Sequence, residues 1–249
     1  MTIIDEVPIT PAARIYAEGW QSWSPTTWYS REMPAYRPAE GWQHLMRFRP
    51  GVKLRDEGLQ GEGLVVIDPG NGAAARVYGA PDASSEVPTI RALWHHDRVV
   101  VRANSTVETW TMDGAAGAES AQAALESFGD RFGHAAAART PGSIPRVWCT
   151  WYQYFEAVTA SDVLENLRAI DELALPIDVV QIDDGWSLGT GEWTAPNPSF
   201  GSLADTVSAI RDSGRRAGIW LAPFSVGSRS DIAVRHPDWL TGPAGYNWG

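Results

Sequence analysis

The strongest constraint on the fold is a strand–helix alternation that begins after Pro145. Three apolar runs with the length of buried strands alternate with two segments of helical periodicity. In chain order these segments are 147–152, 159–173, 177–182, 203–212 and 217–221. The first helical segment opens on a Thr/Ser cap with an acid in its first turn. A strand, helix, strand order at this spacing predicts parallel βαβ units.

The part of the chain before Pro145 has a different pattern. Its first 112 residues alternate short β-rich runs with turn residues. Two pairs of such runs each flank a turn and predict hairpins: 63–67 with 75–78, and 98–102 with 106–111. An Ala-rich helix is expected over about 117–136. The segment 139–145 then carries two prolines and a glycine, so we expect one domain at 1–140 and a second at 141–249.

The length of the second domain limits its architecture. A complete (β/α)8 TIM barrel takes about 250 residues, whereas only 104 residues run from Arg146 to Gly249. We therefore interpret the second domain as the first three βα units of a barrel. An autonomous doubly wound α/β domain is the alternative. The expected fold class is α/β plus β.

Composition excludes several classes of function. The net charge of −10, with no run of Lys or Arg, makes nucleic acid and anionic membranes poor partners. The single Cys149 cannot form an intrachain disulfide or a thiolate metal site. The N-terminus lacks a signal-peptide pattern, and no apolar run approaches the about 18 residues of a membrane span. We expect a cytoplasmic protein.

The acid pair Asp183–Asp184 directly follows the strand pattern 177–182 and precedes Gly185 and Trp186. Barrel enzymes keep their chemistry at the C-terminal ends of parallel strands. Carboxylates accept hydrogen bonds from sugar hydroxyls, and an indole covers the apolar face of a sugar ring. Adjacent residues point to opposite sides of a strand, so sugar binding is favoured over a catalytic pair. The alternative is a helix cap with a salt bridge.

Aromatic residues gather at the ends of the other two strand patterns. Alternation places Trp148 in the packing and sends Trp151 and Tyr152 towards the barrel mouth. Trp220, near the end of the third strand, fits an aromatic wall or the core equally well. Cys149 is interpreted as a small buried side chain, since no histidine lies near it in the sequence to activate a nucleophile.

Two further motifs lie outside this pattern. The loop 18–25 carries two indoles beside Gly, Ser and Pro, which suggests an ordered loop that could cover a site on another domain. His95 and His96 have no carboxylate at ligand spacing, so a metal site is not expected there. The segment 236–239 is interpreted as a structural turn.

Five ordered motifs together resemble glycoside hydrolase family 36, the melibiase-type α-galactosidases, and especially its compact bacterial branch. The motifs are GWQSW at 19–23, WCTWYQYF at 148–155, QIDDGW at 181–186, GIWLAPFSV at 218–226 and HPDW at 236–239. The resemblance implies an N-terminal β-sandwich followed by a (β/α)8 barrel. It also implies retaining hydrolysis of terminal α-galactosides in oligosaccharides such as melibiose and raffinose, without metal or other cofactor.

The resemblance also implies a set of galactose-binding residues. The two acids would hold the axial 4-hydroxyl and the 6-hydroxyl, two indoles and a tyrosine would line the pocket, and the N-terminal domain would lend one more indole. These residues are Asp183, Asp184, Trp220, Trp151, Tyr152 and Trp23.

One departure from the family pattern concerns catalysis. The nucleophile of the family is an Asp on the fourth barrel strand, in a Lys-x-Asp context, and the acid/base Asp lies on the sixth. The only lysine here is Lys53, before the barrel segment. We therefore expect both catalytic groups beyond Gly249, and this chain alone to be inactive. The open alternatives are α-galactosyl transfer as in raffinose-synthase relatives, action on α-N-acetylgalactosamine, and a non-catalytic galactose-binding protein. The oligomeric state is left open.

Overall fold

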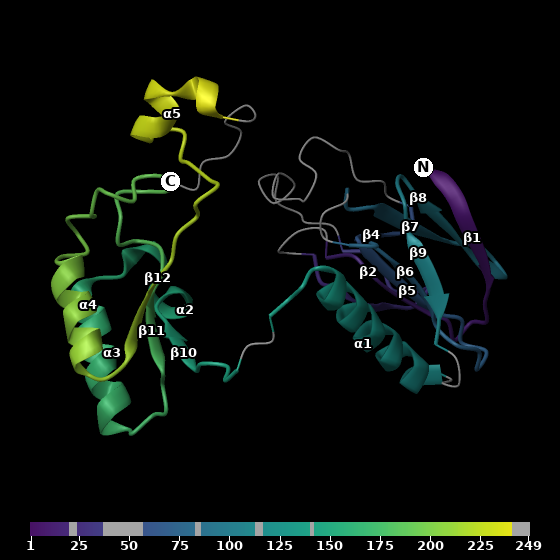
Figure 1. Ribbon diagram of the computed structural model, residues 1–249, viewed down its shortest axis with the longest axis horizontal. Coiled ribbons are helices and arrows are strands. Elements are labelled where there is room, and N and C mark those ends of the chain that lie inside the picture. The colour runs from purple at the N-terminus through teal and green to yellow at the C-terminus, as the bar shows by residue number, and fades with distance from the viewer. Residues whose placement is uncertain (20–23, 37–56, 83–85, 113–116, 140–141, 241–249) are drawn as a thin grey trace. The chain divides into compact units, whose positions relative to one another are not determined.

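The computed structural model divides the chain into two compact units, Met1–Thr140 and Pro141–Gly249, each with its own apolar core (Figure 1). The structure describes residues 1–19, 24–36, 57–82, 86–112, 117–139 and 142–240. Among the helices of these segments, none combines the length and the apolar character that a membrane crossing requires.

Within its described residues, the first unit contains two antiparallel sheets and the helix α1 (Figure 1). The four-stranded sheet has the order β1 (Thr2–Pro8), β8 (Arg98–Ala103), β7 (Thr89–Trp94), β4 (Leu59–Glu62). The five-stranded sheet has the order β3 (Thr27–Tyr29), β2 (Arg14–Ala17), β5 (Leu64–Asp68), β6 (Arg76–Gly79), β9 (Glu108–Thr111). Alternate residues of both sheets point into one shared core, which gives a sheet-on-sheet arrangement.

One of the two expected hairpins is confirmed and the other is wrong. β5 and β6 pair as antiparallel neighbours across the turn that follows Asp68. The runs 98–102 and 106–111, in contrast, lie in different sheets: β8 pairs with β1 and β7, and β9 pairs with β6. The alternation of apolar residues identified both strands, but it carries no information about which neighbour a strand pairs with.

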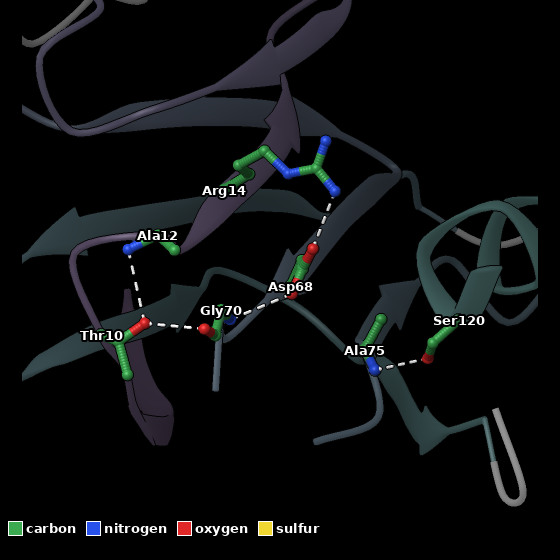
Figure 2. A network of polar contacts seen from close by, with 7 residues as sticks. All are labelled: Thr10, Ala12, Arg14, Asp68, Gly70, Ala75 and Ser120. Carbon is green, nitrogen blue, oxygen red and sulfur yellow. Dashed lines mark hydrogen bonds and ion pairs between the residues drawn. The ribbon is translucent and has the colours of Figure 1, made fainter. Parts of the chain in front are cut away.

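The turn between β5 and β6 is fixed by polar contacts to the first residue of β2 and to the segment before that strand (Figure 2). Asp68 accepts from Arg14 Nη2 at 2.8 Å and from the backbone N–H of Gly70 at 3.0 Å. The Thr10 hydroxyl donates to the Gly70 carbonyl at 2.8 Å. Gly70 has φ +73°, a conformation that favours glycine.

The expected helix is confirmed as α1 (Gly117–Ala135). It covers the outer face of the five-stranded sheet, where Ala124 is fully buried against Val66 and Val77. The buried Ser120 hydroxyl accepts the backbone N–H of Ala75 at 2.7 Å and ties the helix to the start of β6 (Figure 2).

The second unit contains a parallel three-stranded sheet in the order β10 (Val147–Cys149), β11 (Val179–Ile182), β12 (Arg216–Ile219). Two helices, α3 (Ala160–Glu172) and α4 (Leu203–Asp212), connect the strands, which confirms the βαβ prediction. The Thr159 cap is confirmed: its hydroxyl and the Asp162 side chain form a reciprocal capping box.

The first strand is shorter than the sequence predicts. The expected run 147–152 ends at Cys149, and α2 (Trp151–Tyr154) and the 3₁₀ helix η2 (Phe155–Ala157) follow at once. The change occurs at Thr150, whose backbone is helical with φ −70° and ψ −24°, while its N–H still bonds to the Gln181 carbonyl of the neighbouring strand at 3.2 Å. The last described elements are the short helix α5 (Asp231–Arg235) and the 3₁₀ helix η3 (Pro237–Trp239), and η3 lies in the segment 236–239 that the sequence indicates as a turn.

Candidate sugar-binding site

The candidate site lies where the three parallel strands end. The register pairs Cys149 with Gln181 and Ile182 with Ile219, so the residues that follow the strands come together. The backbone N–H of Asp183 donates to Thr150 Oγ1 at 2.9 Å, and the N–H of Trp220 donates to the Ile182 carbonyl at 2.9 Å. Three segments far apart in the sequence thus meet at one sheet edge.

Strand alternation sorts the side chains of this sheet onto two faces. Val180 and Ile182 are fully buried in a core with the helices, as is expected for the covered face. Cys149, Gln181 and Asp183 project from the opposite face, where Sγ of the cysteine lies 3.2 Å from Asp183 Oδ2. Gly218 leaves the adjoining position without a side chain. A Cβ at this position would lie 3.3 Å from Cβ of Gln181, which is a tight contact.

Asp183 is 8% exposed and is held by several donors. Its Oδ2 accepts from Gln181 Nε2 at 2.8 Å and from the Cys149 thiol at 3.2 Å. Its Oδ1 accepts the backbone N–H of Asp184 at 3.0 Å. Hydrogen bonds of this kind compensate a buried carboxylate for the water that it loses.

Asp184 is less enclosed and accepts the backbone N–H of Gly185 at 2.8 Å. Burial, together with the negative charge of Asp183, raises the pKa of Asp184, and the hydrogen bond from Gly185 opposes this shift. Neither acid forms an ion pair among the described residues, and the next helix is capped by Ser202. The structure therefore gives no support to the helix-cap and salt-bridge alternative.

A third carboxylate, which sequence reasoning missed, lies beside the pair. Burial and the charge of Asp184 raise the pKa of Glu156, in the 3₁₀ helix η2. This helix packs on Gly185, where a Cβ would lie only 2.6 Å from the Glu156 carbonyl oxygen, and Gly185 has φ +115°. The glycine of the motif is thus required by close backbone approach.

The indole next to the acid pair is not an open sugar-binding surface. Trp186 is 5% exposed and belongs to the core, so the expectation of an aromatic plate at this position is wrong. Its Nε1 donates to the Trp220 carbonyl at 3.1 Å. Trp193, which the sequence reasoning did not assign, lies between them, 6.0 Å from the Trp186 ring and 5.9 Å, edge-on, from the Trp220 ring. Trp220 is half-buried, and the Trp193 ring packs against it.

The remaining predicted site residues are placed as follows. Trp151 packs edge-on against Phe155 at 5.1 Å, and Tyr152 is 86% exposed. Neither forms a hydrogen bond to the acid pair within the described segments. Trp148 packs against the core of the unit, as predicted. Trp23 lies outside the described residues.

Cys149 and the histidines support no further chemistry in the part of the chain that the structure describes. Burial, with the hydrogen bond and charge of Asp183, raises the pKa of the Cys149 thiol, which therefore stays protonated and is a poor nucleophile. No group of three or more His, Cys, Asp or Glu residues is arranged to hold a metal ion in the described ranges.

Comparison with solved structures gives the class of protein that shares this fold. The solved chains with the same arrangement include α-galactosidases of glycoside hydrolase family 36. AgaA from Geobacillus stearothermophilus is 16% identical, with a TM-score of 0.58 over 97% of this chain and 36% of its own. At that identity the likeness concerns the fold alone.

A closer similarity comes from the α-galactosidase TtGalA of Thermus thermophilus. It is 31% identical, with a TM-score of 0.68, over 98% of this chain and 50% of TtGalA. TtGalA has been solved in complex with p-nitrophenyl α-D-galactopyranoside and with stachyose.

Curated relatives that are named as α-galactosidases match this chain over shorter segments. The bifunctional α-galactosidase/sucrose kinase AgaSK of Mediterraneibacter gnavus is 33% identical over 98 residues, 36% of this chain and 10% of AgaSK. An α-galactosidase of Escherichia coli is 29% identical over 82 residues, 30% of this chain and 12% of its own. No family model matches the chain. The resemblance to α-galactosidases is confirmed, and the chain spans only part of each relative.

Proposed function

We propose that this chain forms part of a retaining α-galactosidase and contributes the residues that bind the galactose ring. The observation that carries the proposal is the pair Asp183 and Asp184 at the sheet edge, beside the braced indole of Trp220. The likeness to TtGalA over 98% of the chain supports it, because TtGalA structures hold α-galactosides.

We infer that the parallel sheet belongs to a (β/α)8 barrel, with the second domain at 141–249 as its first three βα units. Parallel sheets are normally covered on both faces. Here helices cover one face, while the other carries Val147, which is 47% exposed, and Gln181, which is only partly buried. Further strands that close a barrel would bury that face.

Within such a site the acids would accept hydrogen bonds from galactose hydroxyls. Trp220 and Trp151 would line the ring, with Tyr152 beside them. Trp23 lies outside the described residues and stays a prediction of the family resemblance. A retaining mechanism needs two carboxyls about 5–5.5 Å apart that flank the scissile bond. Adjacent Asp183 and Asp184 project differently from one strand end, so other parts of the protein would supply that catalytic pair.

The test uses the longest product of the gene that encodes this chain. We expect it to hydrolyse p-nitrophenyl α-galactoside with retention of the anomer, as followed by proton NMR. Asp184→Ala should lower kcat/KM about 100-fold or more, because hydrogen bonds to a charged acceptor contribute about 1.5–3 kcal/mol each. Asp183→Ala should also lower it.

The matched control is Asp212→Ala, at an exposed acid in the last turn of α4. It should leave the rate near the wild-type value. Wild-type rates in both site variants would remove the acid pair from the sugar site. Activity only on α-N-acetylgalactosaminides, or transfer without hydrolysis, would replace the proposed substrate or reaction.

A further inference from the structure

The Asp183 carboxylate is largely occupied by this chain before a ligand arrives. A carboxylate oxygen offers two lone-pair directions for hydrogen bonds. Oδ2 uses both, one for the Gln181 amide at 2.8 Å and one for the Cys149 thiol at 3.2 Å. Oδ1 uses one for the backbone N–H of Asp184 at 3.0 Å and keeps one.

Asp184 has a different set of contacts. Its Oδ1 accepts the backbone N–H of Gly185 at 2.8 Å, and its Oδ2 accepts from no other described residue. Three lone-pair directions therefore remain on Asp184 and one on Asp183. Two adjacent acids of the same type thus offer unequal numbers of acceptor sites to a sugar.

Gln181 is placed to produce this difference. It lies in β11, two residues before Asp183, which follows the strand directly, and both side chains project from the same face. Cys149 flanks it on one side, and Gly218 leaves the other side without a side chain. The amide must turn its NH₂ group towards Asp183, because its oxygen would repel the carboxylate.

We propose that Gln181 is a positioning residue that fixes the Asp183 carboxylate, so that Asp183 presents a single acceptor direction to the sugar and Asp184 accepts the other hydroxyl contacts. This inference rests on the proposed galactose-binding function and assigns unequal roles within it. Gln181 itself does not touch the sugar. Its effect on binding passes through Asp183.

The test is a double-mutant cycle on the active gene product. Gln181→Met keeps the length and approximate volume of the side chain but removes the donor. We expect kcat/KM for p-nitrophenyl α-galactoside to fall about tenfold, mostly through a higher KM, as for loss of a hydrogen bond to a charged group. In an Asp183→Ala background the same change should alter kcat/KM less than twofold.

A purely structural role gives a different result. It would lower kcat/KM by the same factor in both backgrounds, or lower it together with the thermal midpoint, and either outcome overturns the proposal. Unchanged kinetics in Gln181→Met also overturns it. The control is Gln122→Met, at an exposed glutamine of α1 that pairs with Glu126, and it should leave KM unchanged.

A second measurement keeps the inference testable without turnover. Alkylation of Cys149 by iodoacetamide, followed by mass spectrometry of its peptide, reports the contact with Asp183. Asp183→Asn should speed alkylation, since it removes a charge that raises the pKa of the thiol. Gln181→Met should also speed it, because the released Asp183 carboxylate can leave the thiol. In the Asp183→Asn background it should give no acceleration, since only the 3.6 Å contact of the amide with Sγ is then lost. If Gln181→Met accelerates alkylation equally in the wild-type and the Asp183→Asn backgrounds, the positioning role is overturned. A wild-type protein without α-galactosidase activity would overturn only the proposed function.

Discussion

Asp5 connects the two sheets of the first unit through a single carboxylate oxygen. Its Oδ2 accepts from the Tyr78 hydroxyl at 2.7 Å and from Arg76 Nη1 at 2.7 Å. Asp5 belongs to β1 of one sheet, and both donors belong to β6 of the other. Burial disfavours the charged form of Asp5 and by itself would raise its pKa. The hydrogen bonds from Tyr78 and Arg76 outweigh this effect, so the pKa of Asp5 is lowered.

At this residue scale we predict that Tyr78→Phe lowers the free energy of unfolding by about 1–2 kcal/mol near neutral pH. The folded pKa of Asp5 lies below its unfolded value of about 3.9. Its stabilising contribution is therefore present above that value and is lost as the pH falls through the folded pKa. Urea unfolding at about pH 7 and pH 3 should show the larger loss at the higher pH, and a loss independent of pH would contradict the role of Asp5.

At the scale of elements, the loop between β11 and α4 supports the loop after β12. The Thr190 carbonyl accepts the N–H of Gly227 at 2.7 Å, and Glu192 accepts the N–H of Asp231 at 2.6 Å. Trp193 of the same loop packs edge-on against Trp220. One connection thus packs against the Trp220 ring, directly after the next strand.

This support predicts that Trp193→Ala raises KM for the α-galactoside about tenfold, because the lost ring leaves Trp220 free to move. Trp193→Phe should keep most of the affinity, since a smaller ring still packs edge-on. The control Trp239→Ala, at an indole that is 64% exposed, should leave KM unchanged. Equal effects of the Ala and Phe variants would exclude a bracing role.

At the scale of the whole molecule, each unit has its own core, but only one face of the parallel sheet is covered by helices. We predict that the 249-residue chain expressed alone hydrolyses no α-galactoside, because the adjacent Asp183 and Asp184 do not supply the carboxyl pair that a retaining mechanism needs. It should also melt broadly or aggregate, because apolar strand and edge surface remains in water. Assay of this chain beside the longest gene product, with calorimetric melts, checks both points. A sharp reversible melt would contradict the second.

The sequence was sufficient where a feature depends on neighbours along the chain. The helix α4 and the cap at Thr159 agree with their predicted positions, because periodicity and capping act within about one helical turn. The order of strands and helices after Pro145 follows from the same local patterns. The motif containing Asp183 and Asp184 indicated the sheet edge, since it directly follows a strand pattern.

What the sequence alone could not provide depends on segments far apart in the chain. The pairing of β8, the burial of Trp186 and the bracing by Trp193 are set by contacts across sheets and loops. The two acids are adjacent in the sequence and chemically identical. Only the tertiary structure distinguishes them, because Cys149 comes from another strand to the oxygen that Gln181 already occupies. Local pattern determined which residues lie together at the end of β11, and packing between distant segments decided how many hydrogen-bond acceptor directions of each acid the other described residues use.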